Sequence, residues 1–296
     1  MAIFGRLLTA MATPFHADGR LDLDGAQRLA EHLLDTGSEG LVVAGTTGES
    51  PTLSHAETLD LFRAVVEAVG ARGSVVAGVG KNDTAATVEL AAEAAGLGVD
   101  GLLVVTPYYN KPSQRGLLGH FSTVAGATDL PVVVYNIPGR TACEVAPTTL
   151  LQLAEGIPTI RGVKDAVGDL GKTAWLASRA PEGFDILAGD DANTLPMLAV
   201  GGVGVISVSG HVVGADLARM IEVFPDDPAK AREIHHRLLG LFTALMTVDT
   251  NPAPLKAALN LLGLPAGPVR PPLADVDGRG QEAIRAALEA TGVAVP

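Results

Sequence analysis

Short apolar runs alternate with amphipathic stretches along most of this chain, and this alternation limits the fold more than any other feature. The pattern is typical of βα units repeated around a parallel sheet. Eight apolar runs are predicted as strands: residues 7–12, 40–45, 74–79, 101–105, 131–136, 159–164, 184–189 and 203–208. Seven helices are predicted between them: residues 23–36, 54–69, 84–97, 114–127, 147–154, 172–178 and 192–200.

Eight nearly continuous apolar strands fit a closed (β/α)8 barrel, the TIM-barrel fold of the α/β class, better than an open doubly wound sheet. The length of 296 residues suits this fold, because such barrels take about 250 residues. Beyond residue 208 only helical patterns remain, at 231–246, 254–262 and 280–291. We therefore expect a barrel over residues 1–226 and a C-terminal helical appendage over residues 227–296.

The charge balance argues against two classes of partner. The formal net charge is −12, whereas nucleic acids and anionic membranes bind basic surfaces, so we expect neither as a partner. Cys143 is the only cysteine, which excludes a disulfide within the chain and gives no sign of an oxidising compartment. No uncharged apolar run approaches the ~18 residues that span a bilayer. We expect a soluble protein of the cytoplasm.

Several polar segments fall where the predicted strands end. In such barrels the loops at the carboxyl ends of the strands carry the chemistry. This rule brings six distant segments to one face: residues 45–50, 107–110, 135–141, 164, 189–191 and 204–207. The three tyrosines of the chain, Tyr108, Tyr109 and Tyr135, all belong to this face. Their hydroxyls can move protons, and threonine hydroxyls and backbone amides can hold a carboxylate. This face is the candidate active site.

Lys164 ends the sixth predicted strand, where a charged side chain is unusual. Lysine is almost never fully buried without a partner, because burial penalises its charged form. A neutral amine can form a Schiff base with a carbonyl substrate, so a half-buried lysine here is a candidate nucleophile. Tyr135, on the neighbouring strand, is the candidate proton shuttle. An isolated lysine at a strand end is more often solvated, and the surrounding hydroxyls favour the chemical interpretation.

No metal and no cofactor are expected, because an iminium on lysine is itself an electron sink. The histidines show no ligand spacing, and the consecutive His235 and His236 diverge on a helix. Asp190 and Asp191 could form a metal pair, but the glycine before them and the helical run after them favour a helix cap.

Three features of the candidate face have structural explanations as well. The Gly-Thr-Thr-Gly run could be an ordinary strand-to-helix turn, with Glu49 and Ser50 as helix-start residues. Arg140 taken singly is more often a surface ion-pair residue. Tyr108 is expected to pack at a contact between subunits. Each feature alone is therefore weak, and their combination carries the argument.

Three motifs occur in the order and at the spacing of a known family. They are Gly45-Thr-Thr-Gly-Glu-Ser50, Tyr135-Asn-Ile-Pro-x-Arg-Thr141 and Gly162-Val-Lys-Asp165. Over essentially its full length, the chain resembles the dihydrodipicolinate synthase and N-acetylneuraminate lyase family of Schiff-base, class I aldolases. The double threonine with Arg140 resembles the dihydrodipicolinate synthase branch, since sialic acid lyases and keto-deoxy-sugar aldolases generally lack that arginine.

The resemblance implies a lyase that condenses pyruvate with L-aspartate-4-semialdehyde to 4-hydroxy-tetrahydrodipicolinate, the first committed step of the diaminopimelate route to lysine. It implies these two small molecules as partners, no separate cofactor, and a homotetramer built as a dimer of dimers. Two alternatives stay open. One is another pyruvate-dependent aldolase acting on a keto-deoxy sugar acid, against which Arg140 argues, and the other is a non-catalytic barrel.

The resemblance also implies roles for single residues. Lys164 forms the imine with pyruvate, and Tyr135 acts as general acid and base. Thr46 and Tyr109 complete a relay of hydroxyl groups, with Tyr109 entering from a neighbouring subunit. The implied substrate-binding residues are Thr47 and the backbone at Ile206 for the pyruvate carboxylate, Arg140 for the carboxylate of the semialdehyde, and Gly189.

Feedback inhibition by lysine is expected to be weak or absent. Lysine-sensitive relatives bind the inhibitor at the dimer interface, and this chain has counterparts of that site in His55, Asn82 and Tyr108. However, Ala86 stands where sensitive members typically carry a glutamate for the amine of the ligand, and Thr58 replaces a histidine.

Overall fold

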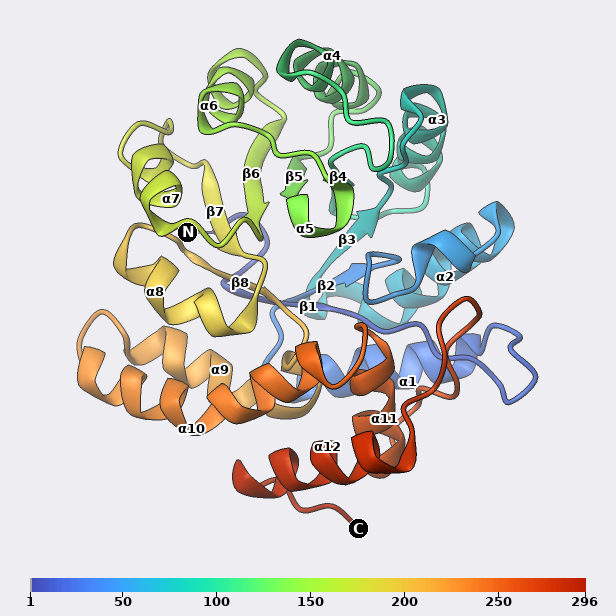
Figure 1. The fold of residues 1–296 in the computed structure, drawn as a ribbon. Coiled ribbons are helices and arrows are strands. Elements are labelled where there is room, and N and C mark those ends of the chain that lie inside the picture. Colours follow the sequence, from blue (N-terminus) through green and yellow to red (C-terminus); the bar gives the residue numbers. More distant parts are fainter. Residues whose placement is uncertain (1) are drawn as a thin grey trace.

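The structure, a computed structural model, describes residues 2–296. Its centre is a closed barrel of eight parallel strands, in which each strand pairs with the next and β8 pairs back to β1 (Figure 1). The strands are β1 (Leu7–Ala10), β2 (Gly40–Val43), β3 (Ser74–Gly78), β4 (Gly101–Val105), β5 (Val132–Asn136), β6 (Ile160–Asp165), β7 (Asp185–Ala188) and β8 (Gly204–Ser207). The predicted (β/α)8 barrel of the α/β class is confirmed, with all eight predicted strands present.

Helices surround the barrel on its outer side (Figure 1). They are α1 (Leu23–Asp35), α2 (His55–Val69), α3 (Thr84–Ala95), α4 (Gln114–Ala125), α6 (Pro147–Gly156), α7 (Leu170–Ala177), α8 (Thr194–Ala199) and α9 (Gly210–Val223), whereas the short α5 (Pro138–Thr141) lies inside this ring, near the ends of β4 and β5. Three short 3-10 helices are η1 (Ser50–Thr52), η2 (Gly70–Arg72) and η3 (Asp191–Asn193). The seven predicted helices are present with slightly shifted ends. The short α5 was not predicted, because a four-residue helix has no readable period, and no predicted helix range covered α9, although only helical patterns were expected beyond residue 208.

The start of α2 shows how capping sets a boundary. The Ser54 hydroxyl accepts a hydrogen bond from the Glu57 backbone N–H, and the Glu57 carboxylate accepts one from the Ser54 backbone N–H. This reciprocal cap satisfies two amides that the first turn of the helix leaves unpaired. The helix therefore begins at His55, and Ser54 is its cap.

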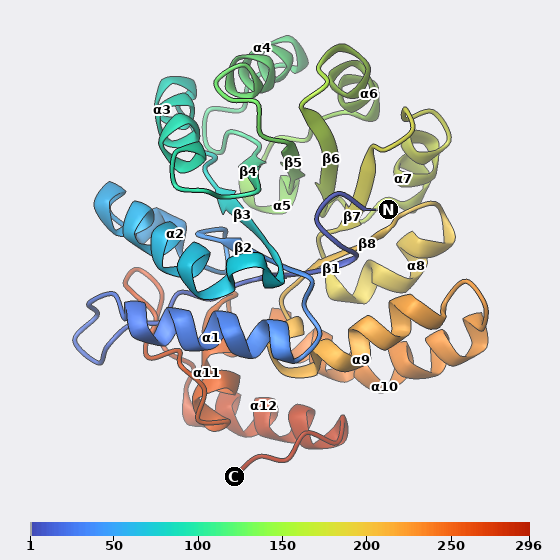
Figure 2. The ribbon, with the colours of Figure 1, turned by 180° about the vertical axis from the view of Figure 1, so that it is seen from behind.

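The interior of the barrel is a packed core. Alternate residues of each strand point inward, and every strand except β6 supplies one or two side chains to the inward cluster. The inward cluster consists of Phe4, Leu8, Ala10, Val42, Val76, Leu103, Val133, Tyr135, Leu187 and Ile206. Phe4 closes the amino end, where the N-terminal segment crosses the barrel (Figure 2). Its ring lies so close to Gly101, at the start of β4, that any Cβ there would collide with it. Tyr135 is the polar exception near the carboxyl end.

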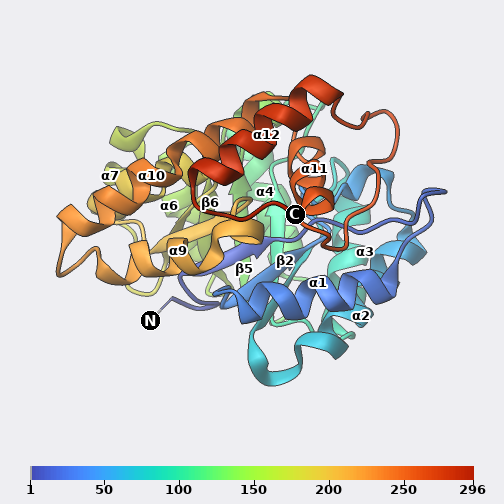
Figure 3. The ribbon, with the colours of Figure 1, turned by 90° about the horizontal axis from the view of Figure 1, so that it is seen from below.

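Three further helices follow the barrel: α10 (Pro228–Thr247), α11 (Ala253–Leu261) and α12 (Gly278–Ala290). They correspond to the three predicted C-terminal helices. α10 packs against both α9 and α12, and α11 packs against α10 and α12 (Figure 3). Because α10 packs directly against α9, the structure of residues 2–296 shows no gap between the barrel and the appendage. The domain boundary between residues 226 and 227 stays a prediction. No helix within residues 2–296 is long and apolar enough to cross a membrane.

Candidate active site at the carboxyl end of the barrel

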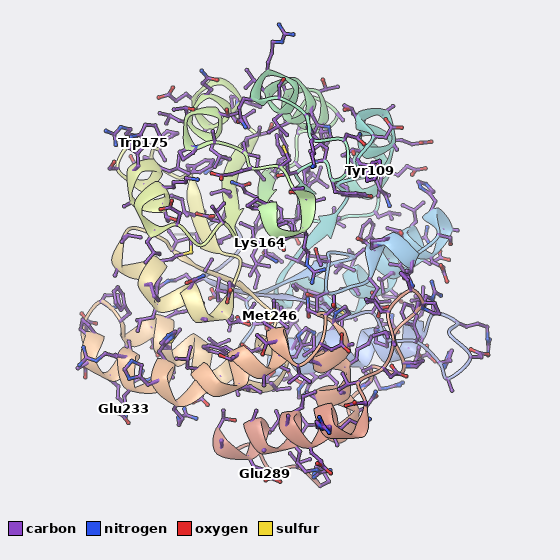
Figure 4. All side chains as sticks on the ribbon, in the orientation of Figure 1. Tyr109, Lys164, Trp175, Glu233, Met246 and Glu289 are labelled. Carbon is purple, nitrogen blue, oxygen red and sulfur yellow. The ribbon has the colours of Figure 1, made fainter. Side chains whose placement is uncertain are left out.

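Lys164 occupies the next-to-last position of β6, and the strand register pairs it with Tyr135 on β5 and Leu187 on β7. The residue is only 4% exposed, at the centre of the barrel in Figure 4. Its Nζ atom lies 4.3 Å from the centroid of the Tyr135 ring. Among residues 2–296, no carboxylate lies within the 4.0 Å of an ion pair with this amine. Lys164 is thus a buried amine without a counter-ion, as a Schiff-base nucleophile requires.

Tyr135 and Thr46 line the same small cavity. This cavity, of about 30 Å³, lies between the ends of β2, β3, β4 and β5. Thr46 also lines a larger cavity of about 320 Å³ that opens beside it. The Lys164 amine lies against the Tyr135 ring, Tyr135 shares the small cavity with Thr46, and Thr46 also borders the larger cavity. Their placement suits a chain of hydroxyl groups that moves protons.

The larger cavity has walls from distant parts of the chain. The loop after β2 supplies one wall through Thr46 and residues 49–52, and α5 supplies another through Arg140 and Thr141. Tyr108 also lines this cavity, whereas the sequence suggested a contact between subunits, and that contact stays a prediction. The C-terminal helical region contributes residues 251–252 and 272–273. Nothing in the strand pattern predicts that this region forms part of the site.

Arg140 stands exposed at the mouth of the larger cavity, on α5. One nitrogen of its guanidinium group, Nη2, donates a hydrogen bond to the backbone carbonyl of Asn251 at 3.1 Å. No carboxylate within the described chain forms an ion pair with it, so the interpretation as a surface ion-pair residue is wrong. The remaining N–H groups are available for an anionic ligand.

The remaining predicted binding residues are Thr47 in the loop after β2, Ile206 on β8 and Gly189 directly after β7. Thr47 is 2% exposed, and its Oγ1 atom accepts a hydrogen bond from Asn251 Nδ2 at 3.1 Å. Ile206 lies on β8, in the inward cluster that contains Tyr135. The Gly189 N–H donates to the Asp165 carbonyl at 2.8 Å, and a Cβ at Gly189 would lie 2.7 Å from that of Ala166. The chain therefore needs glycine where the backbone after β7 meets the end of β6.

Within the single chain, the Tyr109 side chain does not reach this site. Its side chain is 89% exposed, and Figure 4 shows it well away from Lys164. Its backbone has φ of +72°, a conformation that is strained for a bulky side chain. Such strain persists where the surrounding structure or function holds it. Entry of Tyr109 into a neighbouring subunit stays a prediction.

Left-handed backbone conformations gather at the same end of the barrel. Five residues other than glycine have positive φ within residues 2–296: Ala44, Glu49, Tyr109, Lys111 and Ala142. All five lie in the loops that follow β2, β4 and β5. Residues held in such unfavourable backbone conformations cluster at functional sites, where the surrounding structure stabilises them. This distribution is a second feature, independent of the side chains, that favours a functional site at this end.

Glu49 has a role that the sequence motif did not reveal. Its Oε1 atom lies 2.6 Å from Lys256 Nζ, and both side chains are 1% exposed. Its Oε2 atom accepts from the Arg270 backbone N–H at 2.8 Å, and it caps no helix with its side chain. Glu49 does occupy the position before η1, and Ser50 is the first residue of that helix, so both are helix-start residues, but the Glu49 side chain serves the buried ion pair and not the cap. The one available signal was Lys256 itself, a lone charge within the apolar run that forms α11.

Asp190 and Asp191 both make structural contacts. The Asp190 carboxylate accepts from the Ala192 N–H and caps η3, so the preference for a cap over a metal pair is confirmed for this residue. Asp191 accepts from the backbone amides of Val208 and Ser209, at 3.1 and 2.8 Å, and thereby joins the ends of β7 and β8. Burial raises the pKa of Asp191. No group of three or more His, Cys, Asp or Glu residues that could hold a metal occurs in the described part of the chain.

The sequence and the fold of the chain are both similar to those of enzymes from one family. Residues 3–291 match the Dihydrodipicolinate synthetase family. The 4-hydroxy-tetrahydrodipicolinate synthase of Moorella thermoacetica is 54% identical over 291 residues, which cover 98% of this chain and 99% of that protein. DHDPS from Cyanidioschyzon merolae, solved with lysine bound, is 44% identical with a TM-score of 0.97, covering 99% of this chain and 100% of that chain. The chloride-inhibited dihydrodipicolinate synthase of Acinetobacter baumannii, solved with pyruvate, is 33% identical with a TM-score of 0.95 and the same coverages.

Proposed function

The chain belongs to the Dihydrodipicolinate synthetase family, and on this premise we propose that it is a 4-hydroxy-tetrahydrodipicolinate synthase. This enzyme is a lyase that condenses pyruvate with L-aspartate-4-semialdehyde in the diaminopimelate pathway to lysine. The observation that carries the proposal is Lys164, an amine buried against the Tyr135 ring at 4.3 Å with no carboxylate partner in the described chain.

The reaction begins on Lys164. Its neutral amine attacks the keto carbon of pyruvate, and loss of water leaves an imine. Removal of a proton from the pyruvate methyl group gives an enamine, whose carbon attacks the aldehyde carbon of the semialdehyde and forms the new C–C bond. The amine of the semialdehyde then attacks the imine carbon, which closes the ring and releases Lys164. One water molecule leaves over the whole cycle, and the imine supplies the electron sink, so no separate cofactor is required.

The hydroxyl groups near Lys164 carry the protons. Tyr135 gives a proton to the carbinolamine oxygen as water leaves and takes one from the pyruvate methyl group. Thr46 lines the same small cavity as Tyr135 and extends the relay toward the larger cavity. Tyr109 completes the relay from a neighbouring subunit, which its 89% exposure in the single chain supports. We therefore propose a homotetramer, built as a dimer of dimers, that works in the cytoplasm.

The two substrate carboxylates are bound by different groups. Thr47 and the backbone at Ile206 hold the pyruvate carboxylate, beside Gly189 at the end of β7. Arg140 binds the carboxylate of the semialdehyde at the mouth of the larger cavity, where its free N–H groups match a carboxylate in geometry. This division gives each carboxylate its own donors and leaves Lys164 between them.

Borohydride trapping and a coupled condensation assay test the proposal together. The native protein should gain a covalent pyruvate adduct on Lys164 when borohydride is added, and Lys164→Ala should gain none. Arg140→Ala should form the adduct normally with pyruvate alone but raise the KM for aspartate semialdehyde by roughly 10-fold to 100-fold, the effect of a charge-assisted hydrogen bond. An adduct that persists in Lys164→Ala contradicts the mechanism, and unchanged semialdehyde kinetics in Arg140→Ala contradict this choice of aldehyde.

A further inference from the structure

Asn251 reaches the site from outside the barrel. It lies between α10 and α11, and it is 5% exposed. Its Nδ2 atom donates a hydrogen bond to Thr47 Oγ1 at 3.1 Å, across 204 positions of sequence. The C-terminal helical region therefore contacts the threonine that we assign to the pyruvate carboxylate.

The backbone of Asn251 makes a second contact. Its carbonyl oxygen accepts a hydrogen bond from Arg140 Nη2 at 3.1 Å. Both Asn251 and Arg140 line the larger cavity. One residue thus joins the loop after β2 to the helix after β5, and it contacts a proposed ligand of each substrate carboxylate. The two contacts are chemically separable, because the side chain contacts Thr47 and the backbone contacts Arg140.

The contact with Thr47 determines what that hydroxyl can offer a substrate. A hydroxyl group has one proton to donate and two lone pairs to accept. When the Asn251 amide donates to Thr47 Oγ1, one lone pair is occupied and the proton of Thr47 is left for another acceptor. Thr47 donates to no protein group within residues 2–296. A carboxylate only accepts, so a hydroxyl fixed as a donor is suited to it.

The amide of Asn251 is only partly satisfied. Its Oδ1 atom is buried and has no hydrogen-bond partner in the described chain. Burying an unpaired carbonyl oxygen lowers stability, and a purely structural asparagine is expected to pair both ends of its amide. Asn260 on α11 does so, since it donates to the Gly267 carbonyl and accepts from the Gly267 N–H. The contrast favours a role for Asn251 in the site.

We infer that Asn251 is a positioning residue that orients the Thr47 hydroxyl as a donor to the pyruvate carboxylate, while its backbone holds Arg140 for the second carboxylate. The inference rests on the proposed function. It assigns the C-terminal helical region a direct part in substrate binding, beyond its packing against α9. Because only the side chain acts on Thr47, an alanine at this position separates the two contacts.

Steady-state kinetics of Asn251→Ala test the inference. The KM for pyruvate should rise about threefold to tenfold, as expected for one lost hydrogen bond, and the KM for the semialdehyde should change less, because the backbone carbonyl that holds Arg140 remains. The pyruvate concentration for half-maximal borohydride adduct should rise by the same factor. Asn260→Ala is the matched control, since it removes a paired asparagine of the same region that contacts neither Thr47 nor Arg140, and its pyruvate KM should be unchanged.

A double-mutant cycle shows whether Asn251 acts through Thr47. Asn251→Ala should raise the pyruvate KM in the native background and have little further effect in the Thr47→Val background. Equal effects in both backgrounds, or an unchanged pyruvate KM in Asn251→Ala, overturn the positioning role. If Asn251→Ala does not fold, Asn251→Asp keeps the shape but cannot donate, and the pyruvate KM should then rise more than tenfold. No borohydride adduct in the native protein overturns the proposed function and this inference together, whereas a normal adduct with unchanged variants overturns the inference alone.

Discussion

The two ends of the barrel are closed by different kinds of side chain. At the amino end, the apolar ring of Phe4 fills the space beneath the strands and leaves no room for a side chain at Gly101. At the carboxyl end, the closing groups include the buried Lys164 and the buried Glu49–Lys256 ion pair, among loops with left-handed backbone conformations. The same strands therefore end in an apolar plug on one side and in the polar candidate site on the other. Burying charged side chains lowers the stability of the fold, and the apolar side chains in the rest of the barrel core offset that loss.

Tyr135→Phe is expected to have the largest effect on the carboxyl end. The change removes one hydroxyl group and keeps the ring over Lys164 Nζ, so the fold should be retained while proton transfer is lost. We expect kcat to fall roughly 10²-fold to 10⁴-fold, the usual contribution of a general acid and base. Stopped assays of product formation with thermal unfolding as control measure both properties. A variant that keeps native kcat would remove Tyr135 from the relay.

Lys256→Met tests whether the carboxyl end also contributes to stability. The substitution leaves the Glu49 carboxylate buried without its partner, which is expected to lower the free energy of unfolding by about 3–5 kcal/mol. Adding Glu49→Gln should recover part of that loss, because the uncompensated charge is gone. Chemical denaturation measures all three proteins. The exposed Lys230–Glu233 pair is the control, and Lys230→Met should change stability by less than about 0.5 kcal/mol.

Phe4→Ala tests the amino end. Removing a ring that is 96% buried leaves a cavity beneath the barrel, and we expect the free energy of unfolding to fall by about 3 kcal/mol. The KM values and kcat should stay near native at a temperature where the variant is folded, since the ring lies at the opposite end from Lys164. A large fall in kcat of the folded variant would show that the two ends are coupled. Phe4→Leu should show the same pattern with a smaller loss.

Acid should weaken the carboxyl end through His211. Its Nε2 atom accepts from the Ala12 N–H at 3.0 Å and its other ring nitrogen contacts the Val208 carbonyl, so the fully buried ring joins the ends of β1 and β8. Burial lowers the pKa of His211 from 6.5 to about 4. Between these values the unfolded chain binds a proton that the folded chain does not, so the free energy of unfolding falls as pH drops through this window. The loss reaches about 3 kcal/mol near pH 4.

Denaturation at a series of pH values measures this slope. His211→Gln, although less stable at pH 7, should lose stability less steeply between pH 6.5 and 4 because the titrating ring is gone. An identical slope in that variant would assign the acid sensitivity to other groups.

The smallest expected effect is that of added lysine. Ala86 supplies no carboxylate for the amine of the ligand, and the Thr58 hydroxyl is buried and bonded to the Ser54 carbonyl at 3.0 Å. Steady-state rates should therefore be unchanged at sub-millimolar lysine. Inhibition in that range contradicts the expectation, and Ala86→Glu should then increase it further. The Cyanidioschyzon merolae relative, solved with lysine bound, offers a comparison enzyme for the assay.

The sequence alone predicted the barrel and most of its candidate site. The strand pattern repeats in every unit, and the rule that parallel strands end on one face converts positions such as Tyr135 and Lys164 into neighbours. The structure pairs these two residues across β5 and β6. Family resemblance, and not physics, supplied the identity of the substrates and the single roles of Thr47, Arg140 and Gly189.

Only the tertiary structure revealed the contacts between the C-terminal helical region and the loops at the carboxyl end of the barrel. Asn251 meets Thr47 and Arg140, and Lys256 meets Glu49, although some 200 residues separate Asn251 from Thr47 and Lys256 from Glu49. Local periodicity describes which face of a helix is apolar, but it cannot show which distant loop that helix packs against. The order of the strands in the barrel follows from their order in the sequence, because consecutive βα units lie side by side. The position of the C-terminal helical region depends instead on how its side chains pack against the barrel. For this reason the sequence determined the candidate lysine and its strand, and the tertiary structure decided which residues hold the candidate site in place.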